Sequence, residues 1–246
     1  MVSILIILTA LNSNITAADL YNEGNRAYEK GDYKTAVEKY EEAALRIKNS
    51  DLYYNLGNSY FKAGNIGKAI VNYRRAYFLN PRDGDIKHNL AFVRRYRVDK
   101  INIIESPITK FFSALFHFLT ITEAQNLAAF SFFLTAVLVS LFLIMRKKIY
   151  GYAAMVTVIS FFFFLINWQI WRRESISSDA VVVVPEVTAF SGPGNEYKEI
   201  LVIHDGAEVK IREIRNNYAL VQLPGGIGGW VDLNGFEKIF PLPTSD

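Results

Sequence analysis

The chain has 246 residues, of which 27 are Lys or Arg and 24 are Asp or Glu, and it contains no cysteine. The absence of cysteine excludes disulfides, thiol nucleophiles and cysteine-ligated zinc or iron–sulfur centres. Charge is unevenly distributed, because residues 174–246 carry 11 acidic side chains against 5 basic ones. An acidic C-terminal region of this kind is a poor candidate for binding nucleic acid or an anionic lipid surface.

The first residues have the pattern of an export signal. Residues 2–11 are apolar, and small and polar residues follow up to Ala18. We therefore expect a secretory signal peptide over residues 1–17, with cleavage after Ala17 or Ala18 and the next helix starting at about Asp19. No Lys or Arg precedes the apolar run, so an uncleaved apolar segment stays open as the alternative.

Residues 18–100 contain an internal repeat. The segments 24–43 and 57–76 match at an offset of 33 residues, and each reads as a helix, a Gly-Asp or Gly-Asn turn and a second helix. Gly24 and Gly57 would let the two helices of a unit approach closely, and Tyr40 and Tyr73 would fill the space between them. Two such units bury little surface alone, so we expect residues 85–98 to form a third, capping helix.

The second unit resembles the tetratricopeptide repeat. The matching positions are Leu56, Gly57, Tyr60, Ala69, Tyr73, Ala76 and Pro81. The first unit departs from the pattern, with Glu23 and Ala27 where the family has Leu and Tyr. The resemblance implies an α-solenoid in which the first helix of each unit lines a concave groove that binds peptides.

The same resemblance implies which side chains face the groove. They are Tyr21, Asn25, Tyr28, Tyr54, Asn58, Phe61, His88 and Phe92. Asn25 and Asn58 stand where the family often uses Asn to hydrogen-bond a ligand backbone, whereas Tyr21 and Tyr54 stand where some relatives have a Lys for a terminal carboxylate. We therefore expect an extended, partly apolar peptide as partner. A solvated face without a ligand is the alternative.

Two apolar stretches follow and predict a membrane hairpin. Residues 126–145 carry no charge and are long enough to cross a bilayer core, which takes ~20 apolar residues. We expect transmembrane helices over residues 123–146 and 149–171, with a capping box at residues 122–125 and with Trp168 and Trp171 at the membrane interface. The linker before them, residues 101–122, contains an amphipathic segment after Pro107 that is expected to lie in the interface.

Charge predicts the orientation of the hairpin. The loop 146–148 is Arg-Lys-Lys and should stay cytoplasmic, although Arg172 and Arg173 favour the opposite arrangement. The signal peptide decides between the two, because it would export the repeat domain. Two spans then return the C-terminal domain to the same side. We therefore expect both soluble domains to face the periplasm from the inner membrane of a bacterium.

Residues 174–246 change to a period of two, which indicates short strands. Strands are expected at residues 180–184, 208–212, 218–223 and, as the last, 229–231, with turns at Asn216-Asn217 and at residues 224–226. Five or six short strands in a segment of this length fit a small β-barrel.

The turn motifs of this segment resemble those of the bacterial SH3-like domain. They are Ser191-Gly192-Pro193, Asp205-Gly206, residues 223–226 and Gly229-Trp230-Val231. Phe190 stands where the family usually has Arg, and Tyr218 where it usually has Trp. Some members bind cell-wall or other peptides, and these departures bear on that site. Trp230 is expected in the core and not on a ligand surface.

No catalytic constellation is recognisable in the sequence. His88, His117 and His204 lie in three different regions, and none has a second His or a carboxylate at metal-ligand spacing on the same element. No Gly-rich phosphate loop follows a strand, and no Ser stands in a nucleophile elbow. The expectation is a multidomain binding protein that is not an enzyme, without metal or cofactor.

The order of the parts resembles the BatE-like proteins of the Bacteroides aerotolerance (Bat) system. That resemblance covers nearly the whole chain, and domain order carries it more than any single motif. It implies a membrane-anchored scaffold of the cell envelope that works with a MoxR-type ATPase and von Willebrand factor A-domain membrane proteins in stress tolerance. The alternative is a sensor of cell-wall peptidoglycan or peptides that acts through the SH3-like domain.

Overall fold

The computed structural model describes residues 15–100 and 106–240. Most of the predicted signal peptide therefore lies outside the described residues. The chain forms two compact units. The first comprises Met1–Tyr77, Gly84–Ile101 and Ser178–Asp246, and the second comprises Phe78–Asp83 and Asn102–Ser177.

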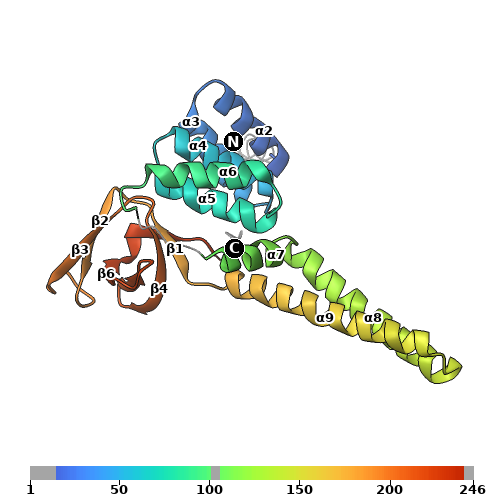
Figure 1. The fold of residues 1–246 in the computed structure, drawn as a ribbon. Coiled ribbons are helices and arrows are strands. Elements are labelled where there is room, and N and C mark those ends of the chain that lie inside the picture. The colour runs from blue at the N-terminus through green and yellow to red at the C-terminus, as the bar shows by residue number, and fades with distance from the viewer. Residues whose placement is uncertain (1–14, 101–105, 241–246) are drawn as a thin grey trace, which may run out of the picture. The chain divides into compact units, whose positions relative to one another are not determined.

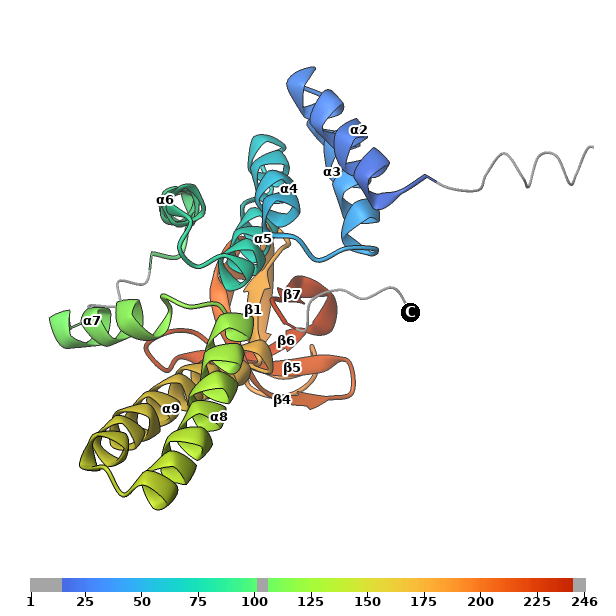
Figure 2. The same cartoon turned by 90° about the vertical axis from the view of Figure 1, so that its right-hand side faces the viewer.

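The N-terminal part of the first unit is a succession of antiparallel helices joined by short turns (Figure 1), which runs from right to left in Figure 2. The helices are α2 (Ala17–Glu29), α3 (Tyr33–Ala44), α4 (Ser50–Lys62), α5 (Ile66–Leu79) and α6 (Gly84–Val93), which the short 3-10 helix η1 (Arg94–Tyr96) extends. The side chains of Thr16, Asp32 and Asn49 cap the first three of them by accepting backbone N–H bonds. The two helical units and the third, shorter helix thus lie where the repeat predicts them.

Close contact between the helices of each unit depends on two glycines. A Cβ atom on Gly24 would lie 2.5 Å from the ring of Tyr40, and one on Gly57 would lie 2.9 Å from the ring of Tyr73. Both tyrosines are buried. The Gly–Tyr pairs therefore set the distance between α2 and α3 and between α4 and α5, as the repeated pattern indicates.

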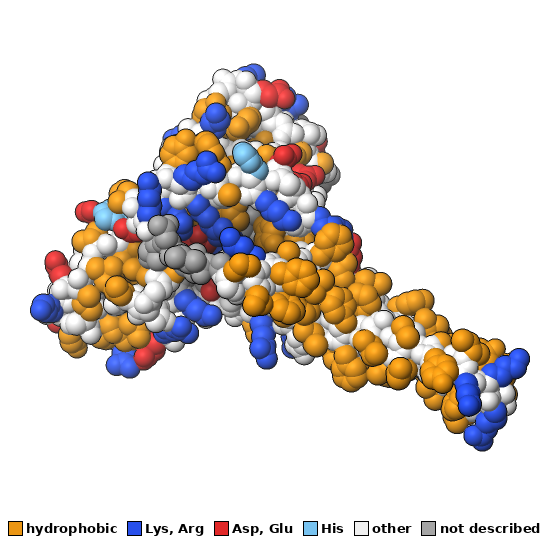
Figure 3. Space-filling view, in the orientation of Figure 1, with side chains coloured by type: hydrophobic (Ala, Val, Ile, Leu, Met, Phe, Trp, Pro, Cys, Tyr) orange, Lys and Arg blue, Asp and Glu red, His pale blue; other side chains and the backbone are white. Residues whose placement is uncertain are grey.

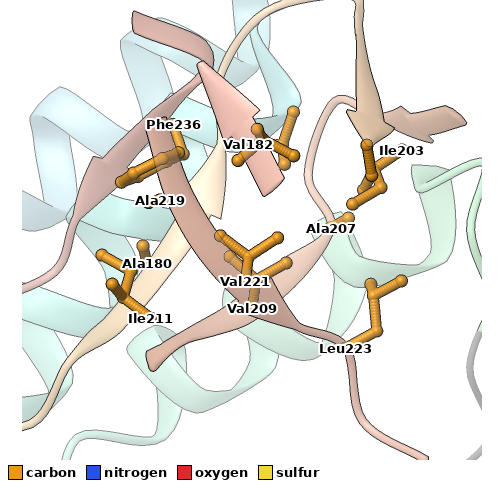
Figure 4. Close-up of a cluster of buried hydrophobic side chains, with 12 residues drawn as sticks. Ala180, Val182, Ile203, Ala207, Val209, Ile211, Ala219, Val221, Leu223 and Phe236 are labelled. Atoms are coloured by element: carbon orange, nitrogen blue, oxygen red, sulfur yellow. The ribbon is translucent and has the colours of Figure 1, made fainter. Parts of the chain in front are cut away.

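The C-terminal part of the first unit is an antiparallel sheet of seven strands in the order β3-β2-β6-β5-β4-β1-β7. The strands are β1 (Asp179–Val182), β2 (Glu186–Phe190), β3 (Glu199–His204), β4 (Glu208–Arg215), β5 (Tyr218–Gln222), β6 (Gly228–Asp232) and β7 (Phe236–Lys238), with the 3-10 helix η2 (Leu233–Gly235) before the last. Buried residues such as Val182, Ile203, Val221 and Phe236 form its core (Figure 4). Trp230 is buried as well, in agreement with its expected place.

Two expectations for this sheet need correction. The described strands form an open sheet with β3 and β7 at its edges, so the predicted closed barrel is not found. The strand at residues 229–231 is not the last one, because β7 follows it and pairs with β1 through Val182 and Phe236. β7 has three residues and follows a helical turn, so it is too short for a period of two to be visible. The turn at Asn216, with φ of 52°, is where the sequence predicts it.

The helices and the sheet of the first unit are joined by buried and half-buried polar contacts. Asp205, in the turn between β3 and β4, accepts the backbone N–H of Ile66 and of Gly67 at 3.0 Å each and so caps the start of α5. Arg75, only 6% exposed, donates to the backbone oxygens of Lys238 and Ile239. Contacts of this kind make one unit from two regions that the sequence separates by the whole hairpin.

Glu208 at the start of β4 is the centre of this interface. Its carboxylate binds Arg94 through two hydrogen bonds of 2.8 and 2.7 Å, and it also accepts from Arg74 and Arg97 at 3.1 Å each. Burial disfavours the charged carboxylate, but the hydrogen bonds and charges of the three arginines outweigh burial and lower the pKa of Glu208. The carboxylate is therefore held in its ionised form between the helices and the sheet.

The second unit consists of α7 (Pro107–Phe116) and two long antiparallel helices, α8 (Ile121–Met145) and α9 (Lys148–Ser175). Arg146, in the left-handed conformation at φ of 55°, ends α8, and the hydroxyl of Thr135 donates to that of Thr157 at 2.8 Å across the pair. Only 11% and 6% of the residues in their most apolar stretches are buried. Figure 3 shows apolar side chains along the pair and Lys and Arg side chains at its tip, where the helices are joined.

Two expectations for the second unit differ from the structure. The capping box at the start of α8 is made by Thr120 and Glu123, two residues before the one predicted, because Thr120 has the extended backbone that an N-cap requires. Trp171 is fully buried, and its Nε1–H donates to the backbone oxygen of Leu119 at 2.7 Å, so it joins helix segments and does not face a membrane interface.

Candidate functional site

The eight side chains expected to face the groove come from the first helix of each helical unit. α2 contributes Tyr21, Asn25 and Tyr28, α4 contributes Tyr54, Asn58 and Phe61, and α6 contributes His88 and Phe92. Spacings of three and four residues place the members of each set on one face of their helix. The six residues on α2 and α4 are half-buried, whereas His88 and Phe92 are exposed.

Asn25 is the centre of a hydrogen-bond network in the first helical repeat, which is formed by α2 and α3. Its Oδ1 accepts from the hydroxyl of Tyr40 at 2.6 Å and from Nδ2 of Asn55 at 3.4 Å. The Nδ2 group of Asn55 also donates to the hydroxyl of Tyr21 at 2.8 Å. Asn25, on α2, therefore links this helix to α3 through Tyr40 and to α4 through Asn55.

The second helical repeat, formed by α4 and α5, has the same hydrogen bonds between equivalent atoms. Oδ1 of Asn58 accepts from the hydroxyl of Tyr73 at 2.6 Å and from Nδ2 of Asn89 at 3.1 Å, and Asn89 also donates to the hydroxyl of Tyr54 at 2.9 Å. Because a carbonyl oxygen has two lone pairs, both acceptor positions of Asn58 are used within the protein. The Nδ2 group of Asn58 forms no hydrogen bond with the residues that the structure describes, whereas the amide of Asn25 also interacts with the hydroxyl of Tyr21 and lowers the pKa of that phenol. Asn58 thus offers an amide donor to a ligand.

The phenol groups in this network stay protonated at neutral pH. Burial raises the pKa of Tyr21, of Tyr40 and of Tyr73, and neighbouring tyrosines or Asp51 act in the same direction. A protonated Tyr40 or Tyr73 must donate to Asn25 or Asn58, and this donation fixes which end of each amide faces outward. The orientation of the Nδ2 groups of Asn25 and Asn58 therefore does not depend on pH in the physiological range.

Two pockets lie along these residues. The larger, of about 300 Å³, is lined by five of the expected residues, Tyr28, Tyr54, Asn58, Phe61 and Phe92, together with Lys62, Tyr73, Asn89 and Val93. The smaller, of about 100 Å³, is lined by Asn25, Tyr28, Glu29, Tyr40 and Asn55. Tyr28 borders both pockets, whereas Tyr21 and His88 border neither. One Lys and one Glu among the lining residues leave the groove without a strong charge.

An aromatic cluster closes the larger pocket at one end. Phe61, Phe92 and Tyr96 have ring centroids 5.2–5.7 Å apart in edge-to-face arrangements, and the His88 ring stacks on Phe92 at 6.4 Å. Phe92 is 37% exposed and Tyr96 54%. Exposed aromatic rings that are already fixed by each other can bind an apolar side chain at low entropic cost.

Sequence reasoning missed five members of this site. The repeat predicts only a packing role for Tyr40 and Tyr73, and it does not single out Asn55, Asn89 or Tyr96. Asn55 and Asn89 stand 34 residues apart, close to the period of the repeat, so a search for repeated polar residues on the first helices would have found them. Tyr96 lies in η1, beyond the last repeated position, and carries no such signal.

The comparisons with known proteins identify the helical repeats. A model described as tetratricopeptide repeat matches residues 50–83, and one described as TPR repeat matches residues 24–64. No curated protein matches the chain. The chain therefore carries tetratricopeptide repeats, which suggest a scaffold for protein–protein interaction. Within residues 15–100 and 106–240, no group of three or more His, Asp or Glu side chains could hold a metal ion.

Proposed function

We propose that the groove of the tetratricopeptide repeats binds an extended, partly apolar segment of a partner protein. The repeated arrangement around Asn25 and Asn58 carries this proposal. Each asparagine has its oxygen engaged within the protein, and the Nδ2 group of Asn58 forms no hydrogen bond with the described residues and lies next to a pocket with aromatic walls. Two amide donors at equivalent places in successive units suit two backbone carbonyls of an extended peptide. The aromatic cluster then takes an apolar side chain of the same segment.

The proposed scaffold is anchored in a membrane by α8 and α9. Their length and their exposed apolar side chains support this role, since a helix of 25 or more residues reaches across a hydrocarbon core of ~30 Å at 1.5 Å per residue. The interface around Glu208 gives independent support. It joins the repeats, which precede the hairpin, to the sheet, which follows it, and both must therefore lie on one side of a membrane. A pair of spans meets that requirement, whereas a single span does not.

The basic loop at Arg146, Lys147 and Lys148 favours the orientation with the loop in the cytoplasm and both soluble parts in the periplasm of a bacterium. The order of repeats, hairpin and sheet is similar to that of BatE-like proteins. On that resemblance we propose that the partners are von Willebrand factor A-domain membrane proteins and, indirectly, a MoxR-type ATPase.

Photocrosslinking tests the groove. A photoreactive phenylalanine analogue at Phe61 should trap a protein of defined mass in intact cells, and the same analogue at Glu38, exposed on α3, should not. Asn58→Asp is the informative second change, because it keeps an oxygen for Tyr73 and Asn89 and replaces the amide donor by a carboxylate oxygen, which repels a backbone carbonyl of the ligand. It should reduce the crosslinked product several-fold. Equal trapping from Phe61 and Glu38, or none, would refute the proposal.

Topology can be tested without background labelling, because the chain has no native cysteine. Single cysteines at exposed Lys48, Lys147 and Ile227 report on the repeats, the loop and the sheet. A membrane-impermeant maleimide should label the first and third positions in spheroplasts and the loop only after lysis. Labelling of the loop alone in intact spheroplasts would contradict the orientation.

A second candidate function is a sensor of cell-wall peptidoglycan or peptides through the SH3-like sheet. The observation that favours it is the open edge at β3, where Ile200 and Val202 are 50% and 43% exposed. An unpaired edge strand can add an extended peptide as a further strand. The full chain in detergent should then bind purified sacculi, Val202→Glu should abolish that binding, and Phe61→Ala should leave it unchanged. The opposite pattern assigns any binding to the groove.

A further inference from the structure

A second pocket of the first unit, of about 390 Å³, shares no residue with the groove pockets. It lies where α3, α4 and α5 meet β7, and this volume is within the range of small-molecule and side-chain sites, roughly 300–1,000 Å³. Ala44, Leu45 and Leu56 supply an apolar wall, and Leu45 is 50% exposed. The pocket can therefore hold an aliphatic chain.

The charged residues that line the pocket disfavour an anion. Arg75 is the only cation among the lining residues, and its three guanidinium nitrogens contact Glu237 at 2.9 Å and the backbone oxygens of Lys238 and Ile239. Glu42 pairs with Arg46 at 3.0 Å. The lining thus has three carboxylates against one cation that is already paired with one of them, which disfavours a carboxylate or phosphate ligand.

Glu41 is the one lining carboxylate that forms no direct ion pair with the residues that the structure describes. It is exposed, and it accepts a hydrogen bond from the hydroxyl of Tyr60. Burial, together with the hydrogen bond to Glu41, raises the pKa of Tyr60, so this group is a neutral donor. Lys68 donates to the same hydroxyl at 3.3 Å, so its ammonium is linked to the carboxylate only through that hydroxyl. A carboxylate without a direct ion pair beside an apolar wall favours a cation with an aliphatic stem.

Two buried polar atoms of the lining have no partner. The hydroxyl of Tyr53 and Oδ1 of Asn72 form no hydrogen bond within the described residues, and the two side chains are 0% and 2% exposed. Nδ2 of Asn72 donates to the backbone oxygen of Lys68 at 2.8 Å, which fixes Oδ1 as the unpaired atom. Buried polar groups without partners are uncommon in folded proteins, and both can accept from an N–H donor.

We propose that this pocket binds a primary ammonium group on a short aliphatic stem. The ammonium pairs with Glu41 and donates to the unpaired acceptor of Asn72, and the stem lies on Leu45 and Leu56. Such a group is carried by a lysine side chain of a peptide or by a free alkylamine, and the chemistry of recognition is the same for both.

The test uses the full chain in lipid nanodiscs, with empty nanodiscs as blank, and isothermal titration calorimetry. The probes are acetyl-Leu-Lys-Leu-amide and the matched peptide with norleucine, which keeps the stem and lacks the charge. The lysine peptide should bind at least about tenfold more tightly, since a hydrogen bond to a charged group has about that effect. Glu41→Gln should remove most of this difference, and Glu38→Gln on the same helix should not change it.

Competition with n-butylammonium identifies the source of the ligand. Displacement of the lysine peptide at similar concentration supports the site and points to a free amine, whereas displacement only at much higher concentration supports the site and points to a peptide. Three results overturn the proposal. They are equal affinity for the norleucine peptide, equal weakening by Glu38→Gln and Glu41→Gln, and no binding heat at millimolar probe.

Discussion

Asp205 caps a helix that begins 139 residues before it in the chain, and its Oδ1 accepts the backbone N–H of Gly67 at 3.0 Å. The other carboxylate oxygen accepts from Ile66, so two of the unpaired donors at the start of α5 are satisfied by the sheet. The cap is therefore a link between two regions as well as a local feature of the helix.

Removal of this cap should open the start of α5 selectively. We expect Asp205→Ala to lower the local stability of the first turn of α5 by about 1 kcal/mol, the usual effect of losing an N-cap acceptor. Hydrogen exchange followed by mass spectrometry on the full chain should show faster exchange at residues 66–69. The first turn of α4, which Asn49 caps, serves as the internal reference. Uniform acceleration across both helices would show instead that the whole unit is destabilised.

The close packing at Gly67 leads to a second prediction about the same interface. A Cβ atom at this position would lie 2.1 Å from the backbone oxygen of Val182, so α5 and β1 would have to separate. We expect Gly67→Ala to lower the free energy of unfolding by roughly 1–3 kcal/mol, as overpacking does. Urea unfolding of the full chain followed by circular dichroism measures the change. Gly84→Ala is the control, because a Cβ there meets nothing within 4 Å, and it should be neutral or slightly stabilising.

Glu208 should make the stability of the first unit depend on pH. Its pKa is lowered in the folded protein, so its contribution is fully present above the pKa of an unfolded Glu, about 4.3, and is lost as the pH falls below that value. Glu208→Gln should cost about 2 kcal/mol at pH 7, the scale of hydrogen bonds to charged groups. The difference from the unmodified chain should shrink as the pH falls below about 4.3 and through the lower pKa of the folded state.

The control for Glu208 lies on the same strand. Glu213 is exposed and pairs only with Arg215, so Glu213→Gln should change the unfolding midpoint little at any pH. If the two variants show the same pH dependence, the interface around Glu208 does not hold the carboxylate in the way that the three arginines indicate.

The helical part of the fold could be predicted from the sequence because its determinants are local and repeated. Gly24 and Gly57, with Tyr40 and Tyr73, recur at a fixed offset, and that offset alone fixes which helices pack together. The residues expected to face the groove come from the same register, and their role in binding stays a prediction. The sequence predicted the positions of Asn25 and Asn58 on the first helix of each repeat. It did not predict their hydrogen-bond partners on the neighbouring helices.

The interface between repeats and sheet could not be predicted, for a different physical reason. Asp205 and Glu208 look like ordinary turn and strand-end residues, and their partners lie more than a hundred residues earlier in the chain. No local propensity or period signals such a contact. The sequence also could not determine the position of the capping box at the start of α8. Thr120 and Thr122 both fit the pattern, and only the backbone conformation chooses between them.

The hydroxyl groups of Tyr73 and Tyr53 give the last prediction, because only one of them has a partner. The hydroxyl of Tyr73 donates to Asn58 at 2.6 Å, whereas that of Tyr53 is buried without a hydrogen bond in the described part of the chain. Tyr73→Phe should therefore lower the free energy of unfolding by about 1 kcal/mol, the net worth of a neutral hydrogen bond, and Tyr53→Phe should be neutral or stabilising. Both changes remove the same atom from a buried ring, so their difference isolates the hydrogen bond. If urea unfolding shows equal losses for the two, the asparagine at position 58 is not held by Tyr73, and its free donor would lose the fixed orientation on which peptide binding in the groove depends.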